Sequence, residues 1–307
     1  MIKFTVLIFY FFSFNSYGIN EIGVAWKGKS SMAERVYKSF LEGLGDSKKK
    51  YRFEKKTELK TLDNLEQTIR EFEKTKSSIL LFRSNAFKLI SKKPSKLPTF
   101  LGAGNNPKIL GVADDAFRPI RNATGVTYYI PLEKHYKIFK SIFPKMSSLA
   151  LMTERNHPGS LIEKSETKIQ CEKYKLNCDY LEFKSSKDLL SKLDKMKRKY
   201  DAVVIGAQDL IMKNTSTIVK KLSKTPVLAY ASKPVEDGAL IGFVASDEVL
   251  GKKLAKSFLE FYEEKKKIHE IPFKRDDSPQ FQINVNTAKG LGIEIPFEII
   301  NAAKIIQ

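Results

Sequence analysis

Short apolar segments alternate with amphipathic helical segments along most of the chain. Residues 79–82 and 202–205 are apolar runs with the length of strands that are buried on both faces. In other segments, such as residues 32–44, the apolar residues recur at helical spacing. Strands that alternate with helices in this way are typical of a parallel sheet covered by helices on both sides. The pattern therefore predicts a doubly wound α/β architecture.

The length of the chain favours two such units. At about 150 residues per domain, 307 residues correspond to two domains rather than one very large sheet. We therefore expect two doubly wound, Rossmann-like lobes. In an open α/β sheet the ligand binds beyond the carboxyl ends of the strands, so two facing lobes would enclose one ligand cleft.

An export signal is indicated at the N-terminus. Lys3 precedes an apolar run of about ten residues, which is too short to span a membrane. Ser16 and Gly18 supply the small residues that a signal peptidase recognises. We expect residues 1–18 to be a cleaved signal peptide, with a buried first strand or helix as the alternative. No Cys lies near this point, so we expect no lipid anchor and a location in the periplasm or outside the cell.

The chain is strongly basic, with 54 Lys and Arg against 35 Asp and Glu and a net charge of +19. Only nine of these cations are Arg, the residue that most often reads bases, and no nucleic-acid-binding motif is present. We therefore expect a solvated Lys-rich surface and no nucleic-acid partner. Attraction to anionic ligands or lipid head groups stays open.

The cysteine and histidine content constrains the chemistry further. Cys171 and Cys178 are seven residues apart and are predicted to form a local disulfide in an oxidising compartment, with two free buried thiols as the alternative. His135, His157 and His269 are scattered along the chain. We therefore expect neither a metal site nor a cofactor.

One motif points to a different function. Residues 23–30 match the phosphate-loop pattern G-x-x-x-x-G-K-[ST]. A true phosphate loop begins where the strand ends, whereas here the apolar residues Val24 and Trp26 continue through the motif. An NTPase is therefore the least favoured interpretation, and the segment is better explained as a ligand-facing loop. No other catalytic motif stands out, so we do not expect an enzyme.

Polar residues that follow predicted strands are the candidate ligand contacts. We expect Ser31, Asn85 and Ser160 to lie near helix N-termini and bind an anionic group, and Asp209 to accept from an ammonium or hydroxyl group. Ordinary helix caps are the alternative for such loops. Tyr129 and Trp26 are candidate stacking surfaces, with core packing as the alternative for Trp26. The full set of predicted ligand-binding residues is Ser31, Asn85, Asn106, Tyr129, Ser160, Asp209 and Asp247.

Four segments resemble the ABC-transporter substrate-binding proteins of the periplasmic-binding-protein type I group, in the branch that includes tryptophan and tyrosine binders. Residues 122–126, Asn-Ala-Thr-Gly-Val, are similar to that family's Asn-Val-Thr-Gly-Val crossing between lobes. Residues 224–240 resemble its Pro-Val and Val-x-x-Gly-Ala-Leu segment, and residues 250–252 its Leu-Gly-Lys helix start. Residues 283–302 resemble its closing Ile-Asn and Leu-Gly-Ile-x-Ile-Pro pattern.

The resemblance implies a monomer that captures a small ligand, amino-acid-like or anionic, by hinge closure. It would deliver this ligand to an inner-membrane ABC permease; a periplasmic sensor that signals to a membrane receptor is the alternative. We expect lobe 1 to comprise residues 19–125 and 247–272, and lobe 2 residues 126–246 and 273–307.

The resemblance is weakest where the family binds its ligand. Asn106 occupies a position where the family often has Asp. At a second position where the family often has Asp, this chain has Gln208, or Asp209 if the alignment shifts by one residue. Asp247 and Glu248 replace the aromatic residues that usually precede the Leu-Gly pair. We therefore expect a conserved scaffold with altered ligand chemistry.

Overall fold

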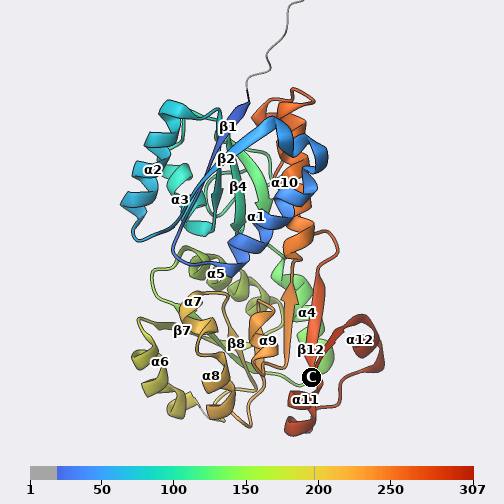
Figure 1. The fold of residues 1–307 in the computed structure, drawn as a ribbon. Coiled ribbons are helices and arrows are strands. Elements are labelled where there is room, and N and C mark those ends of the chain that lie inside the picture. The colour runs from blue at the N-terminus through green and yellow to red at the C-terminus, as the bar shows by residue number, and fades with distance from the viewer. Residues whose placement is uncertain (1–18, 197) are drawn as a thin grey trace, which may run out of the picture.

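The protein, described here from a computed structural model, consists of two α/β lobes stacked one on the other (Figure 1). The structure describes residues 19–196 and 198–307. The predicted signal peptide, residues 1–18, lies outside this range. Within it, no helix is long and apolar enough to cross a membrane.

Lobe 1 contains a sheet whose six strands, counted among the described residues, all run parallel. Their order across the sheet is β11 (Lys274–Arg275), β5 (Ala123–Thr127), β4 (Thr99–Gly104), β3 (Ser78–Phe82), β1 (Asn20–Lys27) and β2 (Tyr51–Leu59). One face is covered by α1 (Ser31–Gly43) and α10 (Asp247–Tyr262), and the other by α2 (Leu62–Thr75) and α3 (Ser84–Lys92) (Figure 1). The short helices η1 (Gly45–Lys50) and η3 (Ile268–Glu270) complete the lobe.

Lobe 2 contains a larger sheet in which five of the seven described strands run parallel and the other two, at one edge, run in the opposite direction. Its order is β13 (Lys304–Ile306), β12 (Gln280–Asn284), β10 (Ile241–Val244), β9 (Val227–Ala229), β8 (Ala202–Ile205), β6 (Ser148–Glu154) and β7 (Asn177–Phe183). The helices of this lobe are α4 (Leu132–Ile142), α5 (Pro158–Lys173), α6 (Ser186–Leu193), η2 (Asp194–Met196), α7 (Asp209–Met212), α8 (Thr215–Lys221), α9 (Lys233–Glu236), α11 (Val285–Leu291) and α12 (Phe297–Ala302).

The central strands are buried on both faces because successive side chains enter different cores. In β3, Ile79 and Leu81 pack into the cluster beneath α2 and α3, whereas Leu80 and Phe82 join the cluster beneath α1 and α10. The strands of lobe 2 alternate in the same way between two clusters. The two doubly wound lobes expected from the sequence are therefore confirmed.

The chain passes between the lobes at three points: after β5, between β10 and α10, and between β11 and β12. Two expected boundaries shift by a few residues. Val126 and Thr127 belong to the sheet of lobe 1, because β5 continues beyond residue 125 to pair with β11. Lys274 and Arg275, expected in lobe 2, form that added strand of lobe 1.

Two further features concern local structure. The sequence pattern does not indicate β2, an edge strand in which charged residues occupy most positions and only Tyr51 is buried. In lobe 2, a disulfide joins Cys171 near the end of α5 to Cys178 at the start of β7. This bond links the helix to the strand that follows it.

Gly125 of β5 lies against the backbone of Leu101 in β4. Its φ is +151°, and a Cβ atom added there would lie 1.9 Å from the carbonyl oxygen of Leu101. Both the backbone conformation and the contact with a neighbouring backbone exclude a side chain. The glycine of the family-like 122–126 segment is therefore a structural requirement of the strand pair.

We predict that Gly125→Ala lowers the free energy of unfolding by about 3 kcal/mol, because the strand must move or adopt a strained φ. Urea denaturation of purified protein measures this change. Gly290→Ala is the control, since a Cβ atom at Gly290, within α11, would meet nothing within 4 Å. The control should be unchanged or stabilised by up to about 1 kcal/mol. Equal stability of the Gly125 variant and the wild type would contradict the prediction.

Candidate functional site

A cavity of about 270 Å³ lies between the two lobes and is lined by residues of both. It is bordered by the carboxyl ends of parallel strands in each sheet, the place where α/β sheets bind ligands. From lobe 1 the lining includes Ser31, Met32, Arg35, Ser84, Asn105, Tyr128 and Asp247. From lobe 2 it includes His157, Gly159, Glu163, Gln208, Met212, Tyr230 and Phe243.

Four long helices begin at this cleft. Ser31 and Ser84 are the first residues of α1 and α3, Gly159 is the second residue of α5, and Asp247 is the first of α10. The N-terminal ends of helices carry partial positive charge and free N–H groups. The cleft is therefore suited to a negatively charged group of a ligand, and Asp247 already supplies one carboxylate.

Asp247 is held by two neighbours on the lobe 1 side of the cleft. One carboxylate oxygen accepts from Nε of Arg35 and the other from the hydroxyl of Tyr128. Burial and the nearby Asp247 raise the pKa of Tyr128, so the phenol remains a neutral donor. The cluster fixes an aromatic ring and a carboxylate at the wall of the cavity.

Glu163 forms the corresponding acidic feature of lobe 2. It is 4% exposed, and its carboxylate accepts from the backbone N–H of Ala207 at 3.0 Å and from Nε2 of Gln208 at 2.7 Å. Burial raises the pKa of Glu163 to about 7. Gly206 makes room for this pair, since an added Cβ atom would lie 2.3 Å from the Glu163 carboxylate.

A side chamber of about 70 Å³ adjoins the cleft, and the two cavities share Asn105, Tyr128, Glu163 and Tyr230 among their lining residues. Glu166 also lines the chamber, and burial raises its pKa to about 7. His135 lies opposite, 2% exposed, with a pKa that burial lowers to about 3 and an Nδ1 atom without a hydrogen-bond partner in the structure. The chamber therefore combines apolar side chains with titratable groups, and Glu163, Glu166 and His135 are uncharged at mildly acidic pH.

Two of the predicted ligand-binding residues line the cleft, namely Ser31 and Asp247. The other five lie one position away from a residue that does. In each case the preceding residue lines the cavity instead: Ser84 before Asn85, Asn105 before Asn106, Tyr128 before Tyr129, Gly159 before Ser160 and Gln208 before Asp209.

Several of these five side chains have partners within the protein. Ser160 donates to the carbonyl oxygen of Glu154 at 2.7 Å, and the Tyr129 ring stacks on Phe117. Asn106 accepts from the backbone N–H of Lys108 at 3.0 Å. These contacts organise the loops at the cleft.

Asp209 and Trp26 also lie outside the cavity lining. Asp209 forms an ion pair with Nη2 of Arg83 at 2.7 Å, which joins lobe 2 to lobe 1. Trp26 is 1% exposed and packs edge-on against Phe82, so it belongs to the core of lobe 1. Its indole provides no surface to the cleft.

The phosphate-loop pattern does not form a phosphate loop. Residues 23–27 lie within β1, and Gly23 packs against the ring of Phe72, where a Cβ atom would approach to 2.3 Å. Ser30 caps α1 by accepting from the backbone N–H of Ala33. Across the described residues, no group of three or more His, Cys, Asp or Glu side chains could hold a metal ion.

The buried carboxyl of Glu163 should make stability depend on pH. Because its folded pKa of about 7 exceeds the usual 4.5, the native state retains a proton that the unfolded chain releases between these values. We predict that this group lowers the free energy of unfolding as pH rises from 4.5 to 7, with no further loss above that range. Glu163→Gln removes this contribution, so the variant should lose less stability than the wild type between pH 5 and pH 8.

Urea denaturation at the two pH values measures the difference between variant and wild type. Glu166, with a raised pKa, and His135 and His157, with lowered pKa values, are present in both proteins, so their contributions cancel in the difference and the contribution of Glu163 is left. Glu172→Gln, at an exposed position of the same helix, is the matched control. Identical pH dependence in wild type and Glu163→Gln would refute the assignment.

Comparison with known proteins identifies the family. A family model described as an ABC transporter substrate binding protein matches residues 24–306. A tyrosine-binding protein of Clostridioides difficile is 22% identical over 201 residues, which cover 64% of this chain and 58% of that relative. The match thus spans little more than half of the relative's length.

Solved structures share the two-lobe fold. The ABC domain from Streptococcus pneumonia in complex with L-Trp is 21% identical with a TM-score of 0.79, covering 93% of this chain and all of that one. A conserved domain protein from Vibrio cholerae is 18% identical with a TM-score of 0.81, covering 94% of this chain and all of that one.

The ligand-free, open structure of a substrate binding protein with adhesive properties from Clostridium difficile is 17% identical with a TM-score of 0.74. It covers 94% of this chain and 99% of that one. The likenesses establish the periplasmic-binding-protein type I fold, and the family match extends over nearly the whole described chain. The chain belongs to the family of ABC transporter substrate-binding proteins.

Proposed function

We propose that this protein is exported, captures a small molecule in the cleft between its lobes and delivers it to an inner-membrane ABC permease. The observation that carries the proposal is the cavity of about 270 Å³ lined from both lobes. A ligand held there would contact both lobes at once. It would therefore favour the conformation in which they are close together. The protein would work as a monomer in the periplasm or outside the cell, without catalysis.

The lining favours a small amphipathic ligand of about the size of an aromatic amino acid. Tyr128, Tyr230 and Phe243 provide aromatic surface, and Met32 and Met212 provide adaptable apolar contacts. The converging helix N-termini would bind a carboxylate. The names of two relatives, one binding tyrosine and one solved with L-Trp, support this class. The cluster at Asp247 would adapt the site to a ligand with an additional donor group.

Two contacts between the lobes support the proposal that the lobes close by hinge motion. The ion pair between Arg83 and Asp209 joins the lobes, and Nδ2 of Asn106 lies 3.4 Å from a carboxylate oxygen of Glu166. Arg83 is positioned by a second bond, from Nη1 to the carbonyl oxygen of Lys27 at 2.8 Å. Separation of the lobes would break the contacts between them, so these contacts belong to the state that holds the ligand.

A thermal-shift screen of the purified protein against L-tryptophan, L-tyrosine, other amino acids and organic acids tests the proposed function. A ligand present at 100 times its dissociation constant stabilises by about 2.7 kcal/mol. We predict that the ligand so found binds Asp247→Asn at least tenfold more weakly, because the cluster loses a charged acceptor. Glu248→Gln, the adjacent exposed residue of the same helix, should bind normally. Equal affinities of the two variants would exclude Asp247 from the site.

The ion pair between Arg83 and Asp209, which joins the lobes, gives a further prediction. We predict that Asp209→Asn weakens ligand binding about threefold to tenfold without touching the ligand, since Asp209 is half exposed and the pair is partly screened. Small-angle scattering should show less compaction on ligand addition than in the wild type. Glu133→Gln, which breaks the Lys173 ion pair within lobe 2, is the control. If both variants bind and compact like the wild type, the pair does not stabilise closure.

A further inference from the structure

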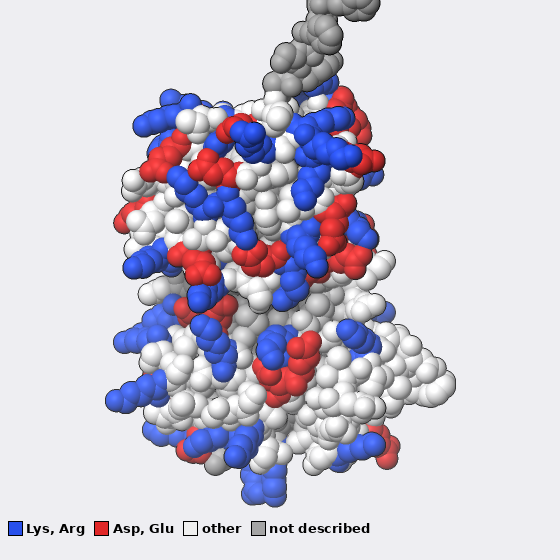
Figure 2. Space-filling view, viewed as in Figure 1, with Lys and Arg blue, Asp and Glu red and all other residues white. Residues whose placement is uncertain are grey.

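The end of lobe 2 opposite the cleft is strongly basic. Strands β7, β6, β8 and β9 are parallel neighbours, so they all start at one edge of the sheet and end at the cleft. Figure 2 shows lysine and arginine side chains at this lower end of the molecule. The segments that lead into these strands contain Lys145, Lys175, Arg198, Lys199, Lys220, Lys221 and Lys224.

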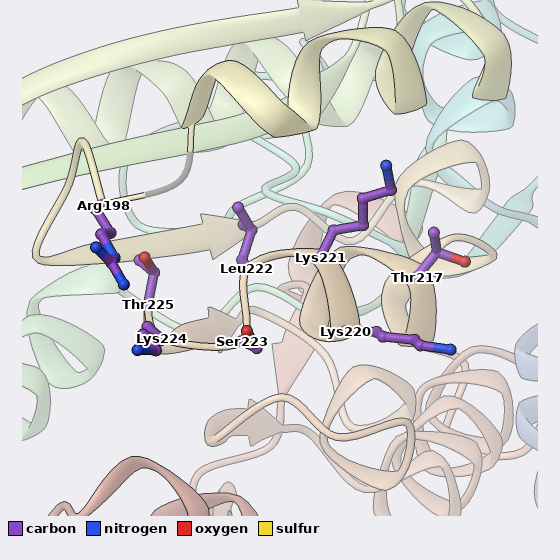
Figure 3. Close-up of a pocket in the computed structure, with 8 residues that line it drawn as sticks. All are labelled: Arg198, Thr217, Lys220, Lys221, Leu222, Ser223, Lys224 and Thr225. Carbon is purple, nitrogen blue, oxygen red and sulfur yellow. The ribbon is translucent and has the colours of Figure 1, made fainter.

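A depression of about 680 Å³ opens among these cations. Arg198 reaches it from the loop before β8, and the other lining residues come from α8 and the turn that leads to β9 (Figure 3). Leu222 is 1% exposed and packs into the core of lobe 2, so it offers little apolar surface to the depression. The hydroxyl groups of Thr217, Ser223 and Thr225 also belong to the lining. Cationic and hydroxyl-bearing side chains therefore make up most of the lining of this depression.

The carboxylates at this end are engaged within the lobe. Asp201 accepts from the backbone N–H and hydroxyl groups of Ser147 and Ser148. Asp179 is bound to Lys199 at 2.9 Å, and Asp194 lies 3.1 Å from Lys221. These acids leave much of the local positive charge uncompensated.

Three cations of the depression have no such partner within the part of the chain that the structure describes. Among the residues that the structure describes, no ion pair links Arg198, Lys220 or Lys224 to a carboxylate. Lys220 lies in the last turn of α8, where a cation interacts favourably with the helix terminus. Arg198 and Lys224 lie outside this helix, so the helix terminus does not account for them. Like charges in one depression repel each other, and an external anion would relieve this repulsion.

We propose that this basic end docks lobe 2 on the phosphate groups of an anionic phospholipid surface. An open depression with cations spread over one edge of a sheet matches a plane of many phosphates better than it matches one enclosed ligand. The cleft lies at the other end of the same strands, so docking leaves it accessible. The interaction is independent of the ligand in the cleft.

The test is cosedimentation with vesicles of phosphatidylcholine, prepared with and without phosphatidylglycerol, using protein purified from an exporting host. We expect binding only to vesicles that contain phosphatidylglycerol, and weaker binding as salt is raised. Each cation near an anionic surface strengthens binding about fivefold, so the triple variant Arg198→Gln, Lys220→Gln, Lys224→Gln should bind about 100-fold more weakly.

A control variant separates the site from net charge. Lys48→Gln, Lys60→Gln and Lys92→Gln together remove the same charge from exposed positions of lobe 1 and should bind vesicles like the wild type. Thermal unfolding of both triple variants verifies that they fold. Equal loss in both variants would overturn the proposal, as would absence of binding to phosphatidylglycerol vesicles. Stabilisation by soluble inorganic polyphosphate without vesicle binding would also overturn it, by assigning the depression to a soluble anion.

Discussion

The parallel arrangement of the strands is the constraint on which the rest of the structure depends. Because neighbouring parallel strands end at one edge, each lobe collects its loops and the N-termini of its helices on the side that faces the other lobe. Ser31, Ser84, Gly159 and Asp247 meet at the cleft although they are distant in sequence, since each begins or nearly begins a helix that follows a strand. The site is thus a consequence of topology, and its chemistry depends on which residues occupy those few positions.

The same constraint explains what the sequence could predict. The apolar runs of β3 and β8 and the spacing in α1 identify the elements, and their alternation indicates parallel sheets covered by helices. The pattern does not identify β2, because its charged residues suit an exposed edge strand as well as a loop. It also misses β11, which has only two residues and depends on β5 for its conformation.

The predicted ligand-binding residues either line the cavity or lie one position away from a residue that does, and the reason for this offset is geometric. Which of two successive loop residues faces the cleft depends on how the backbone turns as it leaves the strand. Two residues at these strand ends have positive φ values: Arg83, directly before Ser84, at 79°, and Ala103, directly before Gly104, at 52°. Positive φ is uncommon for Arg and Ala, so the sequence does not predict these turns. At the turn after Arg83, Ser84 rather than Asn85 lines the cavity. Tyr128 lines the cavity, whereas its neighbour Tyr129 stacks on Phe117 and lines the side chamber.

The sheet of lobe 2 separates two surfaces of different charge: a cleft with a buried carboxyl group at one end of the strands and an exposed cluster of cations at the other. Near the carboxyl ends of its strands, Glu163 is buried and accepts hydrogen bonds from Gln208 and the backbone, so the local charge is limited. At the amino ends, exposed lysines surround a wide depression, and their charge acts over distance without requiring an exact partner. The strands that lie between hold the two surfaces apart. Substitutions at one end can therefore change its charge without disturbing the hydrogen bonds at the other.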